Sequence, residues 1–431
     1  MARKSKQLEV LGNQINNLTN DINIKEIPIV FLEELTNNIT YGITDNRAII
    51  AYQPLENVLM ITFLGLLANC NEWTEIYEFA VLHKEWLEKF LNLQYGIPSV
   101  TTKRRTMSIV DSEELETICV NIIIEKINGL EELFDNKKEE NKDIIAYDGK
   151  ICCGSKRNKV FYSKEKVLPV NAMTAFNVTK DITLATKFIK EKTNEIATGP
   201  ELIKLLDLTN TISTFDALNT QIKTIAAIAG KGGDYVGALK GNQHNFYNDV
   251  VEYFNDKGLY NEAYKNCHYE ETERAHGTQE KRTYVMTDDI EWLQASKWEN
   301  LKTIGLCTRE YMEDGAFKKD VRYFISSLEC ENIKDFSRAI RDEWGIENNL
   351  HWHLDVTFKE DANRTADKTA QSNLNILRKL ALNILKLVKP LYNKSLKLIR
   401  FKLGQDFENE IKKILLYLDI EELRKISSQT K

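Results

Sequence analysis

The sequence lacks both an excess of positive charge and any long apolar run. Of its 431 residues, 58 are Lys or Arg and 64 are Asp or Glu, which gives a formal net charge of −6. That balance is not typical of a protein that binds nucleic acid through its overall charge. The longest uncharged stretch, 57–71, has 15 residues. A membrane-spanning helix needs roughly 20 apolar residues, so no membrane span is predicted.

Several common signatures are also missing. The basic first residues lead into a polar run without an apolar segment, so we expect no secretory signal and a cytoplasmic protein. The seven cysteines include no C-x-x-C pair, which favours free thiols over a disulfide framework. The sequence contains no G-x-x-x-x-G-K-[ST], G-x-G-x-x-G, H-E-x-x-H or G-x-S-x-G motif. ATP-driven, dinucleotide-dependent, zinc-protease and serine-hydrolase chemistry therefore have no support.

Helical periodicity dominates the first part of the chain. Two apolar-periodic segments precede a third helix, which Asp111 and Glu114 open with the spacing of a capping box. Residues 135–142 are charged or polar without one apolar side chain, as is typical of a solvated linker. We predict a helical domain at 1–134 and a linker at 135–142.

From residue 143 the periodicity becomes that of strands. Strand patterns at 143–149, 167–176 and 181–190 are followed by a helix, a strand ending at Asp216, a second helix and a strand at 234–240. This order favours an α/β fold in which helices flank a mixed sheet.

The later part of the chain changes pattern twice. Strand signals, including a hairpin at 301–326, predict a β-rich insertion, and helical patterns resume after it. The predicted division is a core at 143–243 and 333–400, the β-rich insertion at 244–332, and a C-terminal helix at 401–431.

Three carboxylates stand at unusual positions. Asp148 and Asp216 each end a predicted strand, at the edge where α/β sheets place their sites. Glu347 continues an apolar helical stripe through Ile340 and Trp344, so we expect it on the core-facing side of its helix. A carboxylate there requires a proton or a paired cation.

Three converging acids would raise one another's pKa unless a divalent cation neutralises them. Hard oxygen ligands favour Mg²⁺ or Mn²⁺ over zinc. The structural alternative is a set of buried salt bridges to Arg341, Lys150 or Lys240. The pair His351 and His353 could suggest zinc, but no third ligand stands at a suitable spacing.

Several segments together carry a family resemblance. Taken together and in their order along the chain, the segments resemble the H-repeat-associated transposases of bacterial insertion sequences, which belong to the DDE superfamily. The similarity covers most of residues 30–390. The segments are 71–80 (NEWTEIYEFA), 96–99 (GIPS), 145–150 (IAYDGK), 213–217 (STFDA), 231–243 (KGGDYVGALKGNQ), 344–358 (WGIENNLHWHLDVTF) and 377–383 (LRKLALN).

The resemblance implies a ribonuclease-H-like catalytic core preceded by an all-helical domain. It implies that Asp148, Asp216 and Glu347 are catalytic and hold two Mg²⁺ or Mn²⁺ ions. It also implies metal-dependent cleavage of double-stranded DNA at the ends of an insertion sequence, followed by transfer of the 3′ ends into target DNA. Because two ends must be joined, it implies a homodimer or larger synaptic complex, associated with the bacterial nucleoid.

Further residues are expected to contact DNA. The KGNQ segment at 240–243 ends a strand and can present a lysine and amides to phosphate, and His351 could contact phosphate or be a satisfied core histidine. Residues 359–405 hold 11 Lys or Arg against 3 Asp or Glu, so we expect salt-sensitive DNA association there. The predicted contacts are Lys150, Lys240, Asn242, His351, Arg104 and Arg105.

Two positions depart from the resemblance. Glu343 and Thr278 stand where basic residues are expected. Two alternatives to a transposase stay open from the sequence. One is a catalytically silent DNA-binding protein derived from a transposase, and the other is a metal-dependent phosphoester hydrolase or nuclease.

Overall fold

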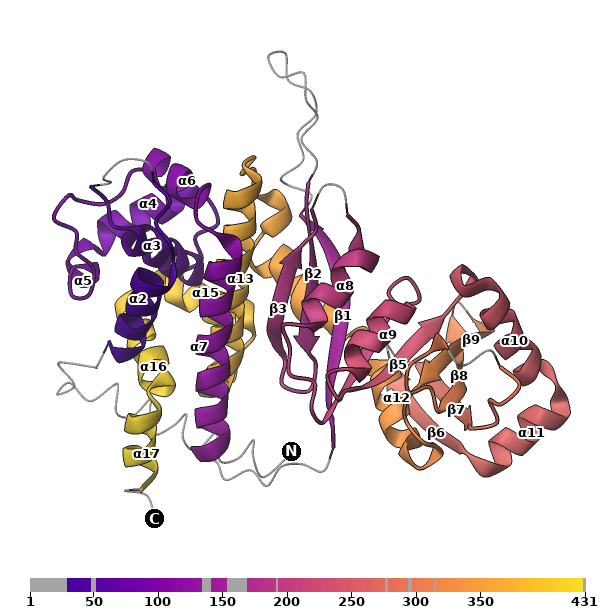
Figure 1. Cartoon of the computed structure of the whole chain (residues 1–431). Helices are drawn as coiled ribbons and strands as arrows, with labels where there is room; N and C mark the ends of the chain where they lie inside the picture. The colour runs from indigo at the N-terminus through magenta and orange to yellow at the C-terminus, as the bar shows by residue number, and fades with distance from the viewer. Residues whose placement is uncertain are drawn as a thin grey trace. The chain divides into compact units, whose positions relative to one another are not determined.

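The computed structural model describes residues 29–47, 52–133, 141–152, 169–190, 193–275, 278–293, 297–313 and 315–428 (Figure 1). These residues fall into two compact units. The helical unit comprises Met1–Lys138, Ile151–Asn171 and His351–Lys431, and the sheet unit comprises Glu139–Lys150 and Ala172–Leu350. No helix of the described ranges is both long and apolar enough to cross a membrane.

The sheet unit is built on nine hydrogen-bonded strands in the order β3-β2-β1-β4-β5-β9-β8-β7-β6. Strands β1, β4 and β5 are parallel, β2 and β3 are antiparallel, and the run from β5 through β9, β8 and β7 to β6 is antiparallel. The strands are β1 (Asp143–Cys152), β2 (Val170–Asn177), β3 (Ile182–Phe188), β4 (Thr211–Phe215), β5 (Asp234–Leu239), β6 (His268–Ala275), β7 (Thr278–Thr287), β8 (Thr303–Glu313) and β9 (Ala316–Ser326).

Each face of this sheet carries its own hydrophobic core, because successive strand residues point to opposite faces. Ile145 of β1 packs in the core that includes residues of α8 (Glu195–Ile203), α9 (Ile222–Ala229) and α10 (His244–Asn255). Ile144 packs in the core on the other face, which includes residues of α12 (Ile333–Asp342).

The predicted order of three strands followed by helix, strand, helix and strand is confirmed, as is the hairpin formed by β8 and β9. The β-rich segment 244–332 extends the same sheet through the pairing of β9 with β5. Strand β6 and the helix α11 (Lys257–Asn266) were not predicted.

The helical unit joins helices from both ends of the described chain. Helix α13 packs against α7, α3 and α6, although they are far apart in sequence. Asn373 of α13 donates from Nδ2 to the carbonyl oxygens of Met107 and Val110, both at 2.9 Å. The helices are α2 (Val30–Gly42), α3 (Leu55–Leu67), α4 (Trp73–Leu82), α5 (Lys84–Leu87), α6 (Val100–Met107), α7 (Ser112–Leu133), α13 (Lys368–Leu387), α14 (Lys389–Tyr392), α15 (Leu396–Gln405), α16 (Phe407–Leu418) and α17 (Ile420–Ser428).

A buried arginine holds three segments of the helical unit together. Arg400 of α15 donates to the carbonyl oxygen of Leu66 at 2.8 Å and to that of Cys70 at 3.1 Å. It also donates to the carbonyl oxygen of Thr357 and, at 3.1 Å, to Oδ1 of Asn71. Because the guanidinium is buried among these acceptors, its polar groups are satisfied without water.

Candidate functional site

Asp148 and Asp216 lie side by side where the pairing of the parallel strands β1 and β4 ends. In the β1–β4 register Tyr147 lies opposite Phe215, so the residue after each is one of these acids. Asp216 directly follows the end of β4, as predicted, whereas β1 continues to Cys152. Asp148 is therefore the first residue of β1 beyond its pairing with β4.

Glu347 reaches the site from a helix whose geometry differs from the expected one. Helix α12 ends at Asp342, and Glu347 begins a π-helical segment, Glu347–His351. Trp344 is 61% exposed, and Ile346 and Leu350 are buried instead. The prediction of a continuous apolar stripe through Trp344 to a core-facing Glu347 is thus wrong, and Glu347 is exposed.

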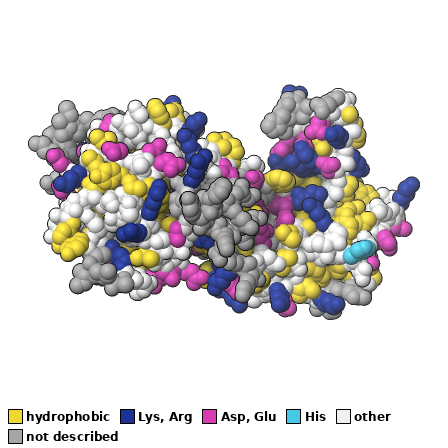
Figure 2. All heavy atoms as spheres, turned by 90° about the horizontal axis from the view of Figure 1, so that it is seen from above, with side chains coloured by type: hydrophobic (Ala, Val, Ile, Leu, Met, Phe, Trp, Pro, Cys, Tyr) yellow, Lys and Arg dark blue, Asp and Glu magenta, His cyan; other side chains and the backbone are white. Residues whose placement is uncertain are grey.

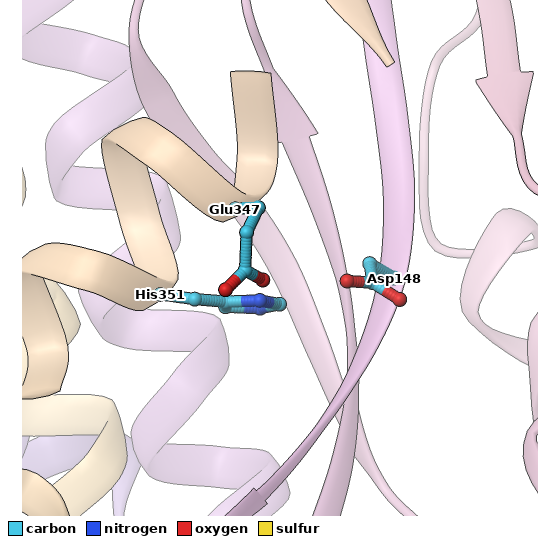
Figure 3. Close-up of side chains that lie close together, drawn as sticks. All are labelled: Asp148, Glu347 and His351. Atoms are coloured by element: carbon cyan, nitrogen blue, oxygen red, sulfur yellow. The ribbon is translucent and has the colours of Figure 1, made fainter. Parts of the chain in front are cut away.

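Asp148, Glu347 and His351 form one cluster (Figure 3). One ligand atom from each side chain lies within 4.8 Å of the others. The strand β1 presents Asp148 toward the helical turn that carries both Glu347 and His351 (Figure 3). Both carboxylates belong to the sheet unit, and His351 lies on the same π-helical turn as Glu347.

Negative charge is concentrated around Asp148. Burial, together with the charges of Asp216, Glu347 and Glu195, raises the pKa of Asp148 to about 7, against a hydrogen bond from the Gly149 N–H that lowers it. Such crowding of like charges disfavours ionisation unless a cation is present. Carboxylate oxygens are ligands that suit Mg²⁺ or Mn²⁺, whereas an imidazole nitrogen suits transition metals better than Mg²⁺. The two carboxylates are therefore the part of this donor set that fits a hard divalent cation.

Asp216 lies beside this cluster and is held by its own loop. Asn219 donates to Oδ1 of Asp216 from its backbone N at 3.0 Å and from its side-chain Nδ2 at 3.1 Å. Asn242 donates from Nδ2 to the carbonyl oxygen of Ala217 at 2.6 Å. The amide nitrogen of Asn242, a predicted DNA contact, therefore braces the loop that carries Asp216.

Glu195 is a fourth acid that sequence reasoning missed. It begins α8, where Asn194 accepts a hydrogen bond from the Ala197 backbone N at 3.0 Å as the N-cap. A Cβ atom built on Gly149 would lie 2.3 Å from Oε1 of Glu195, so this carboxyl group rests directly against β1. The Asn-Glu start of a helix is visible in the sequence, but its proximity to Asp148 comes only from the folded sheet.

Arg341 forms ion pairs with other residues and not with the three acids, as the salt-bridge alternative would have required. Its Nη1 lies 2.8 Å from Oε1 of Glu271 and 2.5 Å from Oε1 of Glu273, both on β6. Glu343, at the position where a basic residue was expected, pairs with Arg322 of β9 at 2.5 Å.

The remaining predicted DNA contacts lie in both units and stay predictions. Lys150 is two residues beyond Asp148 on the same face of β1, and Lys240 is exposed directly after β5. Arg104 and Arg105 are exposed on α6 of the helical unit, where the side chain of Ser99 caps the helix by accepting from the Thr102 backbone N at 3.1 Å.

The predicted basic region contributes less surface charge than its composition suggests. On the face shown in Figure 2, Lys and Arg side chains are interspersed with Asp and Glu. Part of the region's positive charge is internal, because α13 is buried on all sides and α15 turns one arginine inward. The buried members are Arg378, Lys379, Lys386 and Arg400.

Comparison with known proteins identifies the class. The family described as "Transposase DDE domain" matches residues 140–384, and the family described as "DDE_Tnp_1-associated" matches residues 41–122. The chain therefore belongs to the Transposase DDE domain family, whose members are DNA transposases, and the resemblance seen in the sequence is confirmed.

The chain is also similar to individual transposases. It is 33% identical over 341 residues to "Putative transposase YncI" of Escherichia coli O157:H7, which covers 77% of this chain and 82% of the relative. It is 29% identical over 338 residues to "H repeat-associated putative transposase YhhI" of Escherichia coli (strain K12), covering 77% and 84%. A solved piggyBac transposase synaptic complex with hairpin DNA aligns with 93% of this chain and 79% of that chain, at a TM-score of 0.39 and 10% identity.

Proposed function

We propose that the chain is a metal-dependent transposase that cleaves DNA at the ends of its own insertion sequence and joins the freed 3′ ends to target DNA. The observation that carries this proposal is the cluster of Asp148, Glu347 and His351 ligand atoms within 4.8 Å, beside Asp216 on the neighbouring strand. The strand order β3-β2-β1-β4-β5 with β1, β4 and β5 parallel supports a ribonuclease-H-like core.

Asp148, Asp216 and Glu347 would hold Mg²⁺ or Mn²⁺, as two ions. When bound, such a pair of ions activates a water or a 3′-hydroxyl and stabilises the leaving oxygen of an in-line phosphodiester displacement. Asp148, whose pKa is raised to about 7, would have to give up its proton in order to hold a cation. His351 is buried against the carboxylates and can orient Glu347 or accept a proton at this edge.

The substrate in this proposal is double-stranded DNA, both the element ends and the target. Lys150 and Lys240 stand near the acids on β1 and after β5, where a lysine can contact a phosphate as a point charge. Strand joining requires two DNA ends in one complex, so the working form is a dimer or larger assembly.

The proposal is tested with purified full-length protein, Mg²⁺ or Mn²⁺, and labelled DNA that carries the terminal repeats flanking the gene. We expect cleavage and strand joining by the unchanged protein and their loss in Asp216→Asn, which keeps the shape but removes the ligand charge. The matched control is Asp207→Asn, because Asp207 accepts from the Thr209 backbone N at 3.0 Å before β4, away from the site edge.

Three outcomes separate the alternatives. Products formed by the unchanged protein and by Asp207→Asn, but not by Asp216→Asn, support the transposase. End binding without products in all three proteins supports a catalytically silent DNA-binding protein. Turnover of a small phosphoester without DNA binding supports a hydrolase.

A further inference from the structure

Strand β9 brings an arginine to the edge of the sheet that carries the acids. The registers of β1, β4 and β5 place Asp148, Asp216 and Ala238 at one level. Ala238 lies opposite Phe324 of the antiparallel strand β9. Arg322 is two residues from Phe324 toward the carboxyl edge of β5, so it points to the same face of the sheet as these acids.

The hydrophobic core next to Ala238 shows which face of the sheet carries Arg322 and the acids. Ala238 and Phe324 pack in the same hydrophobic cluster as Phe336 and Ile340 of α12. Helix α12 leads into the segment that carries Glu347, so Arg322 and the acids lie on the α12 side of the sheet.

Arg322 is held in place by two contacts. Its Nη2 lies 2.5 Å from Oε2 of Glu343, and its guanidinium carbon lies 5.2 Å from the centroid of the Phe324 ring. Glu343 precedes Glu347 by four residues, which is about one helical turn. The ion pair is therefore anchored next to the segment that presents Glu347.

We propose that Arg322 is the cationic side chain that binds the phosphodiester substrate beside the carboxylate cluster, and that Glu343 positions it. This inference rests on the proposed function. A guanidinium has five N–H donors in a planar fork, so one edge can bond a carboxylate while the other bonds phosphate oxygens. The side chain of Arg322 is 35% exposed, whereas that of Glu343 is 14% exposed, so the arginine retains a solvent-facing edge.

A cation beside this edge would offset the charge of a bound phosphate. Asp148 and Glu347 lie close together with Asp216 on the neighbouring strand, and a phosphodiester would add further negative charge. Arg341, on the same side of the sheet, is engaged with Glu271 and Glu273. The β5–β9 register ends at Leu239 and Tyr323, and the next pair along it would be Lys240 and Arg322. These two cations are therefore neighbours, and both can bind the same phosphate.

The experiment compares full-length Arg322→Ala, Arg322→Lys and Glu343→Gln with the control Lys302→Ala. Lys302 pairs with Glu329 at 2.9 Å and precedes β8 at the opposite end of the sheet, so its removal costs one positive charge and one ion pair away from the site. Four quantities are measured for each protein. They are the rate of end cleavage, the slope of log Kd against log salt for end DNA, the Mn²⁺ affinity without DNA, and the thermal stability.

We expect Arg322→Ala to lower the cleavage rate by about 10²-fold, as loss of a charge-stabilising donor does. It should also reduce the salt slope by about 0.9, the contribution of one phosphate contact, with Mn²⁺ affinity unchanged. Arg322→Lys should keep the slope and recover only part of the rate, because an ammonium lacks the planar fork. Glu343→Gln should keep most of the slope but lower the rate, since the guanidinium is no longer held.

The inference is overturned if Arg322→Ala behaves like Lys302→Ala in rate and salt slope. It is also overturned if Arg322→Ala lowers only the thermal stability, because a structural ion pair would have that effect alone. If the unchanged protein cuts no DNA, the proposed function fails, and the salt slope still tests whether Arg322 touches phosphate.

Discussion

Asn219 donates two hydrogen bonds to one oxygen of Asp216, Oδ1, from its backbone N at 3.0 Å and from its side-chain Nδ2 at 3.1 Å. Both donors are on the same residue, and Asn219 is almost fully buried. The carboxylate is thereby fixed in orientation before any ligand arrives, with Oδ1 engaged by the loop. Oδ2 is then the oxygen that we expect to face a bound cation.

Replacing Asn219 by Ala should loosen this carboxylate while leaving the backbone donor in place. We expect about 1 kcal/mol loss in the free energy of unfolding, typical of one hydrogen bond, and weaker Mn²⁺ binding. Urea denaturation and Mn²⁺ titration measure the two effects. The control Gln221→Ala removes a bond of 2.9 Å to the Leu218 carbonyl in the same turn, and should leave Mn²⁺ affinity unchanged. Equal Mn²⁺ affinity in both variants would contradict a positioning role for Asn219.

Cation affinity should depend on pH through Asp148. Because the pKa of Asp148 is raised to about 7, protons compete with the cation below that pH. We expect the apparent Mn²⁺ affinity to fall by up to about tenfold per pH unit below 7, as one proton must leave. Titrations between pH 5.5 and 8 measure this. Asp148→Asn should bind weakly with a flatter profile, and a profile of unchanged steepness would argue against Asp148 as the titrating ligand.

The same shift predicts how the cation-free protein responds to pH. The pKa of Asp148 is higher in the folded protein than its ordinary value of 3.8, so the folded state holds this proton more tightly. Its contribution to stability is complete below pH 3.8 and is lost as the pH rises through 7. Urea denaturation with a chelator across this range should show the loss. Asp148→Asn should remove that component, and a curve identical to that of the unchanged protein would contradict the assignment.

Glu195→Gln should lower the pKa of Asp148 in the cation-free protein. The substitution removes one of the like charges that raise it and keeps the shape of the side chain. Carboxyl NMR of labelled aspartate follows the titration directly. Glu201→Gln on the same helix is the control, because Glu201 faces Lys187 at 3.8 Å. A shift of equal size in the control would mean that Glu195 has no specific effect.

Arg400→Ala should destabilise the helical unit strongly. The substitution leaves the carbonyl oxygens of Leu66, Cys70 and Thr357 without their donor in a buried place. We expect a loss of about 3 kcal/mol or more in the free energy of unfolding. Lys397→Ala, on the exposed side of the same helix, should stay within about 0.5 kcal/mol. Denaturation of both proteins measures the difference, and equal losses would show that the buried contacts contribute little.

The strands near the site were predictable because their patterns are strong. Residues 144–147 of β1, all of β4 and residues 235–239 of β5 are buried and uncharged, and a short run of this kind has few alternatives to a buried strand. Strand β6 was missed because its sequence, HYEETERA, is rich in charge. These charged side chains form ion pairs with other strands, as when Glu270 pairs with Lys281 of β7 at 2.9 Å. Periodicity within one segment cannot predict such pairs, because the partner lies elsewhere in the sequence.

The site itself was only partly predictable. Asp148 and Glu347 were identified from strand position and resemblance, and the structure brings them together with His351. The π-helical turn at Glu347 could not be foreseen, because the periodicity argument assumed an uninterrupted α-helix. Glu195 was missed for a different reason, since its contact with β1 joins residues that are far apart in sequence.

The continuity of the sheet from β5 into β9 has a mechanical consequence. Four residue pairs lie opposite each other in the antiparallel register of these strands, from Val236–Ser326 to Leu239–Tyr323. Within the described residues, this pairing joins the β-rich segment to the sheet that carries Asp148 and positions Asp216. A load applied to the β8–β9 hairpin would therefore pass along the backbone hydrogen bonds to the strands beside the acids.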